Sequence, residues 1–152
     1  MMQIEFLHAV VDTLLPGLPA TETKPALPAA SEVGVAAKLA AHLETHRDKR
    51  LFVAVLEAIV GEAGGEARFV AMDEGARTAV LQTIEQSQSD AFAALLFVVS
   101  ADYHESEAVM RAFGWRPTPP QPLGYPLPPF DEGKLEELVA SLEGKRPLWR
   151  AA

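Results

Sequence analysis

The stretch that decides the fold is Ser89–His104, SDAFAALLFVVSADYH, which carries no charged residue between Ala91 and Ala101. The large apolar side chains that leave it almost no polar face are Phe92, Leu95, Leu96, Phe97, Val98 and Val99. A helix that is apolar nearly all round has to be surrounded by other elements. The stretch is too short for a membrane span, which needs about 18 apolar residues. We therefore predict the central helix of a bundle, and the alternative is a buried strand.

Amphipathic segments on both sides of this stretch predict further helices. Apolar residues recur at helical spacing in segments that begin near residues 4, 31, 48, 73, 106 and 131. Polar side chains stand where N-caps are needed, and these are Ser31, Asp73, Ser89, Ser106 and Asp131. Gly114 is expected to end one helix in a left-handed conformation. We expect a proline-containing loop at residues 15–30 and a non-helical connection that Phe69 and Met72 fill.

Together these segments predict an all-α fold. It is a single-domain helical bundle of about six or seven helices, with a proline-rich extended strap before the last helix. The predicted domain spans residues 1–143, with the strap at 115–130, and a C-terminal tail follows at 144–152. A length of 152 residues suits one domain. A hydrophobic content of 49% argues against disorder.

Composition excludes several classes of function. The net charge of −8 argues against nucleic acid or an anionic membrane as partner, and we expect no direct membrane insertion. The absence of cysteine excludes disulfides, thiolate metal sites and cysteine catalysis. The opening residues MMQIEFLHAVVDTLLPG do not resemble a secretory signal, so a cytoplasmic location is expected for the chain as encoded.

Residues able to carry chemistry do not converge on a site. His42 and His46 have the spacing of a metal-binding pair, but no third ligand is nearby. Glu5 and His8 resemble half of a di-iron motif whose second copy is missing. His104 lies among acidic residues at a predicted helix end. No nucleophile elbow or phosphate-binding glycine loop is found. We therefore expect no catalytic, cofactor-binding or metal-binding residue in this chain.

The strap, WRPTPPQPLGYPLPPF from Trp115 to Phe130, is the most distinctive segment. Its proline density favours an extended, polyproline-like backbone, and the interleaved aromatic side chains can press into grooves. Three interpretations are open. The strap lashes the last helix to the bundle, or it presents a docking edge to another protein. In the third, residues 116–122 act as a basic-x-x-P-x-x-P ligand for an SH3-like groove.

The tail places an apolar anchor between positive charges. Gly144 and Pro147 are expected to end the last helix, and Trp149 then lies between Arg146 and Arg150. A tryptophan left in water forgoes burial worth about 2 kcal/mol. We predict that Trp149 inserts into a pocket, on a partner or under the strap, while Arg146 and Arg150 meet carboxylates at its rim. A frayed terminus is the alternative.

Four segments resemble subunit 3 of gluconate 2-dehydrogenase-type flavoprotein complexes. Residues 9–17, AVVDTLLPG, resemble that family's opening helix, and residues 31–39, SEVGVAAKL, its second-helix start. Residues 67–84 are similar to its Phe-x-x-Leu and Arg-x-x-Leu block, with Met72 where leucine is commoner. Residues 102–126, DYHESEAVMRAFGWRPTPPQPLGYP, are similar to its closing tyrosine, Gly-Trp and proline-Gly-Tyr signature, which is the most specific of the four.

The resemblance implies a non-catalytic accessory subunit. In that family the small subunit binds and stabilises or matures a large FAD-dependent oxidoreductase of the glucose-methanol-choline (GMC) type, which acts on a sugar, glycoside or sugar acid. A cytochrome c subunit often completes the complex, and FAD is expected in the large subunit only. Family members frequently carry a twin-arginine export signal. None is seen before Ala9, so a periplasmic location would require co-export with a partner. A stand-alone helical interaction or ligand-binding module is the alternative.

Under this interpretation the partner-binding residues lie in the strap and the tail. They are Trp115, Pro119, Pro120, Pro122, Gly124, Tyr125, Arg146, Trp149 and Arg150.

Overall fold

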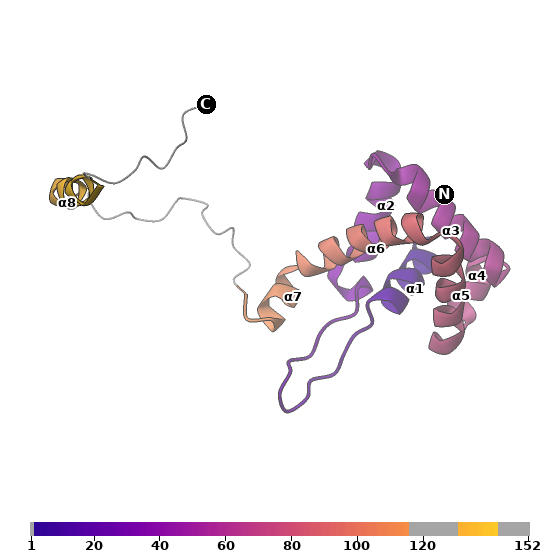
Figure 1. The fold of residues 1–152 in the computed structure, drawn as a ribbon. Coiled ribbons are helices and arrows are strands. Elements are labelled where there is room, and N and C mark those ends of the chain that lie inside the picture. The colour runs from indigo at the N-terminus through magenta and orange to yellow at the C-terminus, as the bar shows by residue number, and fades with distance from the viewer. Residues whose placement is uncertain (1, 116–130, 143–152) are drawn as a thin grey trace. The chain divides into compact units, whose positions relative to one another are not determined.

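The computed structural model describes residues 2–115 and 131–142 (Figure 1). Within these ranges the helices are α1 (Ile4–Leu14), α2 (Val35–Thr45), α3 (Lys49–Ala63), α4 (Glu66–Ala71), α5 (Glu74–Ser87), α6 (Ser89–His104), α7 (Glu107–Ala112) and α8 (Glu132–Leu142). A short 3-10 turn, η1, spans Ser31–Val33. The described residues form no strand, and one isolated antiparallel bridge joins Leu18 and Leu27. The predicted all-α fold is confirmed.

The chain divides into two compact units, Met1–Thr118 and Pro119–Ala152. Helices α1 to α7 belong to the first, and α8 belongs to the second. No helix in the described part of the chain is both long and apolar enough to cross a membrane. The strap from residue 116 onward, the tail at 144–152 and the predicted domain boundary between them all lie outside the described residues.

One hydrophobic core joins the helices of the first unit. In α3 the side chains of Phe52, Val55, Leu56 and Ile59 are fully buried, and they recur at the spacing of one helix face. This face packs against α2, α5 and α6. The core is therefore assembled around the buried side of α3 as much as around the apolar stretch of α6.

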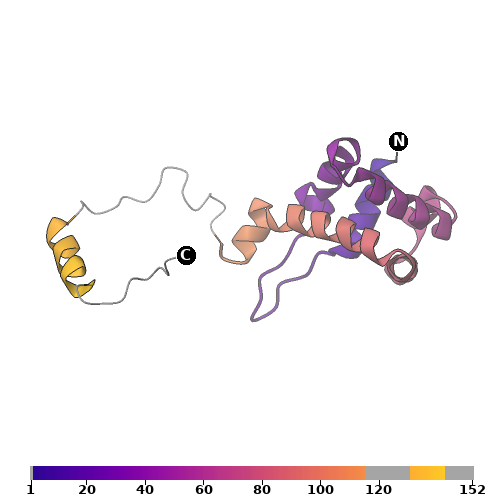
Figure 2. The ribbon, with the colours of Figure 1, turned by 45° about the horizontal axis from the view of Figure 1, so that its top comes forward.

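Helix α6 is buried on one side only. It packs against α2, α3, α5 and α7, and it buries Phe92, Leu95, Val99 and Tyr103 along one face. Figure 2 shows it running along one side of the other helices. Phe97, on the opposite face, is 74% exposed. The expectation that this helix is enclosed on all sides is therefore wrong. The helices of the first unit cover the face with the four buried residues and partly cover Leu96 and Val98, but they leave Phe97 exposed.

Helix α4 occupies the connection where no helix was expected. Gly64 and Gly65 have φ values of +77° and +132°, and they end α3 with hydrogen bonds from Gly64 N–H to the Gly61 carbonyl and from Gly65 N–H to the Val60 carbonyl. The reversed chain begins a new helix at once. Its Phe69 is fully buried and meets Phe6 edge-on, with ring centroids 5.6 Å apart. Six residues are too few to show a helical period in the sequence.

Three of the predicted N-caps are confirmed. The side chain of Asp73 accepts the N–H of Ala76 at 2.8 Å. Ser106 accepts the N–H of Val109 at 3.2 Å, which starts α7. Asp131 accepts the N–H of its third following residue at 3.3 Å and starts α8. Each acceptor satisfies a backbone donor that has no partner inside the helix.

Two predicted N-caps are wrong. The backbone N–H of Ser31 donates to Asp12 at 2.8 Å, and its hydroxyl donates to the same carboxylate at 2.7 Å. Ser31 thus fastens η1 to α1, and α2 starts after Gly34, whose φ of +80° suits glycine. Ser89 is the first residue of α6 and no side chain caps that helix. Ser31 does not cap α2 because its hydroxyl is bonded to the half-buried carboxylate of Asp12 instead.

The loop at residues 15–30 is closed at its base and fastened to α6. Leu18 and Leu27 exchange two backbone hydrogen bonds of 2.8 and 2.9 Å, and Ala30 N–H donates to the Leu15 carbonyl. The Tyr103 hydroxyl donates to the Pro28 carbonyl at 2.8 Å. Burial raises the pKa of Tyr103, and the charge of Glu32 raises it further. The tyrosine is therefore neutral at pH 7 and remains a donor.

We predict that Tyr103→Phe lowers the free energy of unfolding by about 1 kcal/mol at pH 7, because the half-buried hydrogen bond to Pro28 is lost. The folded-state pKa exceeds the unfolded value of about 10. The contribution of Tyr103 to the free energy of unfolding is therefore fully present below pH 10. It is lost as the pH rises through the folded-state pKa. Urea unfolding measures this. The free energy of unfolding of wild type should exceed that of Tyr103→Phe by more at pH 7 than above pH 10.

The chain has two tyrosines, so Tyr125→Phe provides the control. In that variant Tyr103 is the sole tyrosine, and ultraviolet titration of the folded protein reports its pKa directly. A value at or below 10 would contradict the account of Tyr103.

Candidate partner-docking surface

Aromatic side chains form a continuous series from the end of α6 to the turn that follows α7. The ring of His104 meets Tyr103 edge-on, with centroids 5.4 Å apart, and stacks on Phe113 at 6.1 Å. Phe113 in turn lies 5.4 Å from Trp115. The series thus begins at a buried tyrosine and ends at an exposed tryptophan. It brings two rings that follow α7 against the end of α6.

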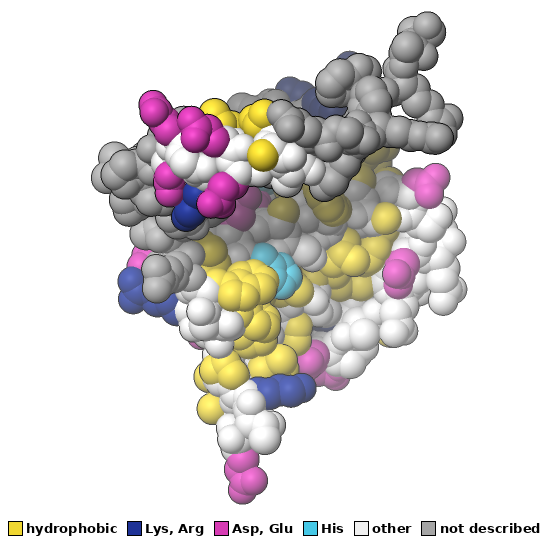
Figure 3. All heavy atoms as spheres, turned by 60° about the vertical axis from the view of Figure 1, so that its left-hand side comes forward, with side chains coloured by type: hydrophobic (Ala, Val, Ile, Leu, Met, Phe, Trp, Pro, Cys, Tyr) yellow, Lys and Arg dark blue, Asp and Glu magenta, His cyan; other side chains and the backbone are white. Residues whose placement is uncertain are grey.

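A further exposed aromatic side chain, Phe97, lies on α6 on the same side as His104. Phe97 and His104 are seven residues apart, which puts them on the same face of the helix. Phe97, Phe113 and Trp115 are 74%, 46% and 57% exposed. We call Phe97, His104, Phe113 and Trp115 the aromatic face. Figure 3 shows hydrophobic side chains gathered around an exposed histidine on one side of the molecule.

The turn after α7 brings Trp115 back beside Phe113. Gly114 has a φ of +73°, and its N–H donates to the Arg111 carbonyl at 2.9 Å. The N–H of Trp115 donates to the Met110 carbonyl at 2.8 Å. This pair of bonds is the Schellman motif, which favours glycine at the left-handed position. The prediction that Gly114 ends a helix in this conformation is confirmed, and the position of Trp115 follows from it.

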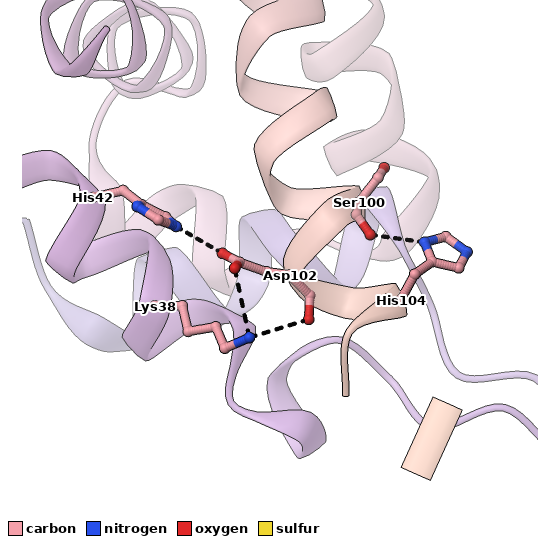
Figure 4. A network of polar contacts seen from close by, with 5 residues as sticks. All are labelled: Lys38, His42, Ser100, Asp102 and His104. Atoms are coloured by element: carbon pink, nitrogen blue, oxygen red, sulfur yellow. Dashed lines mark hydrogen bonds and ion pairs between the residues drawn. The ribbon is translucent and has the colours of Figure 1, made fainter. Parts of the chain in front are cut away.

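His104 is oriented by a backbone carbonyl. Its Nδ1 lies 2.7 Å from the carbonyl oxygen of Ser100, as Figure 4 shows. A carbonyl only accepts, so Nδ1 carries the proton in this contact and Nε2 is left for another interaction. The ring is exposed and therefore combines an apolar stacking surface with one polar atom. Such a side chain suits a contact surface better than a hydrophobic core.

A polar cluster on the other side of α6 fastens that helix to α2. Asp102 and His104 point to opposite sides of α6 (Figure 4). Asp102 Oδ2 lies 2.9 Å from His42 Nε2, and Asp102 Oδ1 lies 3.5 Å from Lys38 Nζ. Lys38 Nζ also donates to the Asp102 carbonyl at 3.4 Å. The cluster neutralises a carboxylate whose side chain is only 13% exposed. We therefore assign it to joining the two helices.

The histidine pair considered for metal binding is engaged with protein groups. The rings of His42 and His46 meet edge-on at 5.4 Å. His42 Nε2 contacts Asp102, and His46 Nδ1 accepts the N–H of Asp48 at 3.0 Å. Within residues 2–115 and 131–142, no group of three or more His, Asp or Glu side chains is placed to hold a metal ion.

Among the predicted partner-binding residues, the structure describes Trp115 alone, and it lies exposed in the aromatic face. The others are outside the described residues, and they are Pro119, Pro120, Pro122, Gly124, Tyr125, Arg146, Trp149 and Arg150. Sequence reasoning missed Phe97, His104 and Phe113. The sequence carries no signal for Phe97, because both the face that carries it and the opposite face with Phe92, Leu95 and Val99 are apolar.

A family model described as gluconate 2-dehydrogenase subunit 3 matches residues 2–119. No curated protein and no solved structure matches the chain. The matched range contains α1 to α7 and every residue of the aromatic face.

We predict that Phe97→Ala changes the free energy of unfolding by no more than about 0.5 kcal/mol, because the side chain is exposed. The matched control is Phe92→Ala in the same helix, where the side chain is 5% exposed. This change should cost about 3 kcal/mol or more through cavity formation. Urea unfolding of the two variants measures both values. A similar loss in the two would mean that Phe97 is part of the core.

Proposed function

The chain belongs to the gluconate 2-dehydrogenase subunit 3 family, and from this membership we propose that it is a non-catalytic accessory subunit of a sugar-oxidising complex. Its partner is a large FAD-dependent oxidoreductase of the GMC type that acts on a sugar, glycoside or sugar acid. The small subunit binds this partner and stabilises or matures it. FAD belongs to the large subunit, and a cytochrome c subunit accepts the electrons in complexes that contain one.

The exposed aromatic face is the observation that carries this proposal. Large exposed apolar patches on a folded protein mark sites of interaction with other proteins. Tryptophan is enriched among the residues that dominate binding energy, and its truncation there costs about 2 kcal/mol or more. The face also leads directly into the strap, since Trp115 is its last member. Proposed contacts in the strap are Pro119, Pro120, Pro122, Gly124 and Tyr125.

The polar clusters of the described residues support a structural role for this chain. Asp102, His42 and Lys38 are used to join α2 to α6, and Asp12 is used to hold Ser31. Arg77 donates to the carbonyls of Phe69 and Val70 at the end of α4. Each of these clusters thus joins two parts of the fold. We assign the oxidation of substrate to the large subunit.

The proposed tail contacts extend the same interface. Trp149 would insert into a pocket of the large subunit, and Arg146 and Arg150 would meet carboxylates at its rim. In such an arrangement the charged residues mainly accelerate association, whereas the buried tryptophan mainly slows dissociation.

We predict that the tagged chain, purified from its native cells, carries a yellow flavoprotein that oxidises a sugar or sugar acid with an artificial electron acceptor. Trp115→Ala should weaken the complex by about thirtyfold in Kd, which corresponds to about 2 kcal/mol. The matched control is Leu51→Ala, since Leu51 is 45% exposed on α3 and lies outside the aromatic face. It should leave the affinity unchanged.

The outcomes separate the two functions under consideration. A stable monomer that carries no flavoprotein would favour a stand-alone interaction module. Full recovery of the flavoprotein with both Trp115→Ala and Phe97→Ala would remove the aromatic face from the interface. Measuring thermal unfolding of each variant alone shows whether a lost complex reflects lost contacts or a lost fold.

A further inference from the structure

A second exposed surface is an apolar groove between α1, α2 and α3. The groove has a volume of about 690 Å³, and its floor includes Ile4, Leu43 and Val53. Ile4 is 41% exposed, although it lies in the helix that buries Phe6 and Leu7 in the core. None of the elements that form the groove contributes to the aromatic face. The groove is therefore a separate surface. The proposed contact of the aromatic face with a partner gives the groove no role.

Three carboxylates line this apolar groove, those of Glu44, Glu57 and Glu66. Glu66 accepts the backbone N–H of Gln3 at 2.9 Å, which fixes it at the start of α4 beside the start of α1. Within the described residues, the side chains of Glu44 and Glu57 accept no hydrogen bond and form no ion pair. Two carboxylates beside an apolar floor are therefore without an ion-pair partner in the described part of the chain.

A smaller hollow of about 270 Å³ continues the groove along α3. It shares Leu43, Val53 and Glu57 with the larger one, and it is also lined by Lys49 and Arg50. Lys49 Nζ is engaged with the Glu44 carbonyl at 2.7 Å. Carboxylates alone thus supply the charge that lines the larger hollow, whereas Lys49 and Arg50 add positive charge beside Glu57 in the smaller one. A ligand that spans both hollows needs the complementary order of charges.

We propose that this groove, which we call the acidic groove, binds a basic amphipathic helix of the large subunit. This inference rests on the proposed function, because it assigns the groove to the same complex. An amphipathic helix fits an apolar groove with side chains at positions i, i+3, i+4 and i+7. Lys or Arg residues beside its apolar stripe face Glu44, Glu57 and Glu66. Its carboxyl end, the negative end of the helix dipole, lies towards Lys49 and Arg50.

The binding experiment uses the full chain and a labelled peptide. The probe is a helical peptide of Leu and Lys with an apolar stripe, and its counterpart carries Glu in place of Lys. Fluorescence anisotropy at low salt should show binding of the Leu/Lys peptide only. Glu44→Gln combined with Glu57→Gln should weaken this binding by about tenfold, and added salt should reduce the difference.

The control must separate a groove from general attraction to an acidic protein. Glu22→Gln combined with Glu74→Gln makes the same change in net charge at exposed positions outside the groove. This variant should bind the Leu/Lys peptide within about twofold of wild type. Equal losses in the two double variants, or no binding of the peptide by wild type, would overturn the proposal.

The complex distinguishes failure of this inference from failure of the proposed function. If the flavoprotein co-purifies normally with the Glu44/Glu57 variant but is lost with Trp115→Ala, the groove assignment is wrong and the proposed function stands. If no flavoprotein accompanies wild type, the proposed function is wrong. If wild type is a dimer that the Glu44/Glu57 variant breaks, the occupant is a second copy, and the assignment to the large subunit is again wrong.

Discussion

The C-terminal end of α6 is held from two directions, and the exposed surface beyond it depends on both. On one side the Asp102 carboxylate joins His42 and Lys38 of α2. On another the Tyr103 hydroxyl donates to the carbonyl of Pro28. These contacts reach residues about sixty to seventy-five positions away in the sequence. With that end fixed, the next residue, His104, has a defined direction, and the rings of Phe113 and Trp115 can assemble on it.

The helices could largely be predicted from the sequence, because their apolar period and their caps are local signals. Asp73 and Ser106 cap as expected, since their side chains accept backbone N–H groups of their own helices. Ser31 does not, because Asp12 lies nineteen positions earlier and its carboxylate becomes a neighbour only in the folded chain. The local sequence shows which hydrogen bonds a side chain can form. Which of them it does form also depends on residues that are distant in the sequence.

The candidate surfaces were harder to predict than the helices. An evenly apolar helix has no polar face to indicate which side meets water, so Phe97 was assigned to the interior with its neighbours. Trp115 is predicted because it belongs to the proline-rich strap, whose interleaved aromatic side chains can press into grooves of a partner. The acidic groove is formed by residues from α1, α2 and α3 that are separated in the sequence. Its glutamates look like ordinary solvated positions until the helices bring them together.

The loop at residues 15–30 shows where this chain can change length. Its two ends are fastened by the Leu18–Leu27 pair and by the contacts of Ser31 and Pro28, whereas Glu22 and its neighbours at the tip are exposed. Lengthening such a loop costs little, since closure entropy grows only with the logarithm of its length. Insertions and deletions at the tip should therefore change the free energy of unfolding only slightly. The same position is suited to carrying an inserted epitope or a fluorescent label, because no residue of the loop lines the acidic groove.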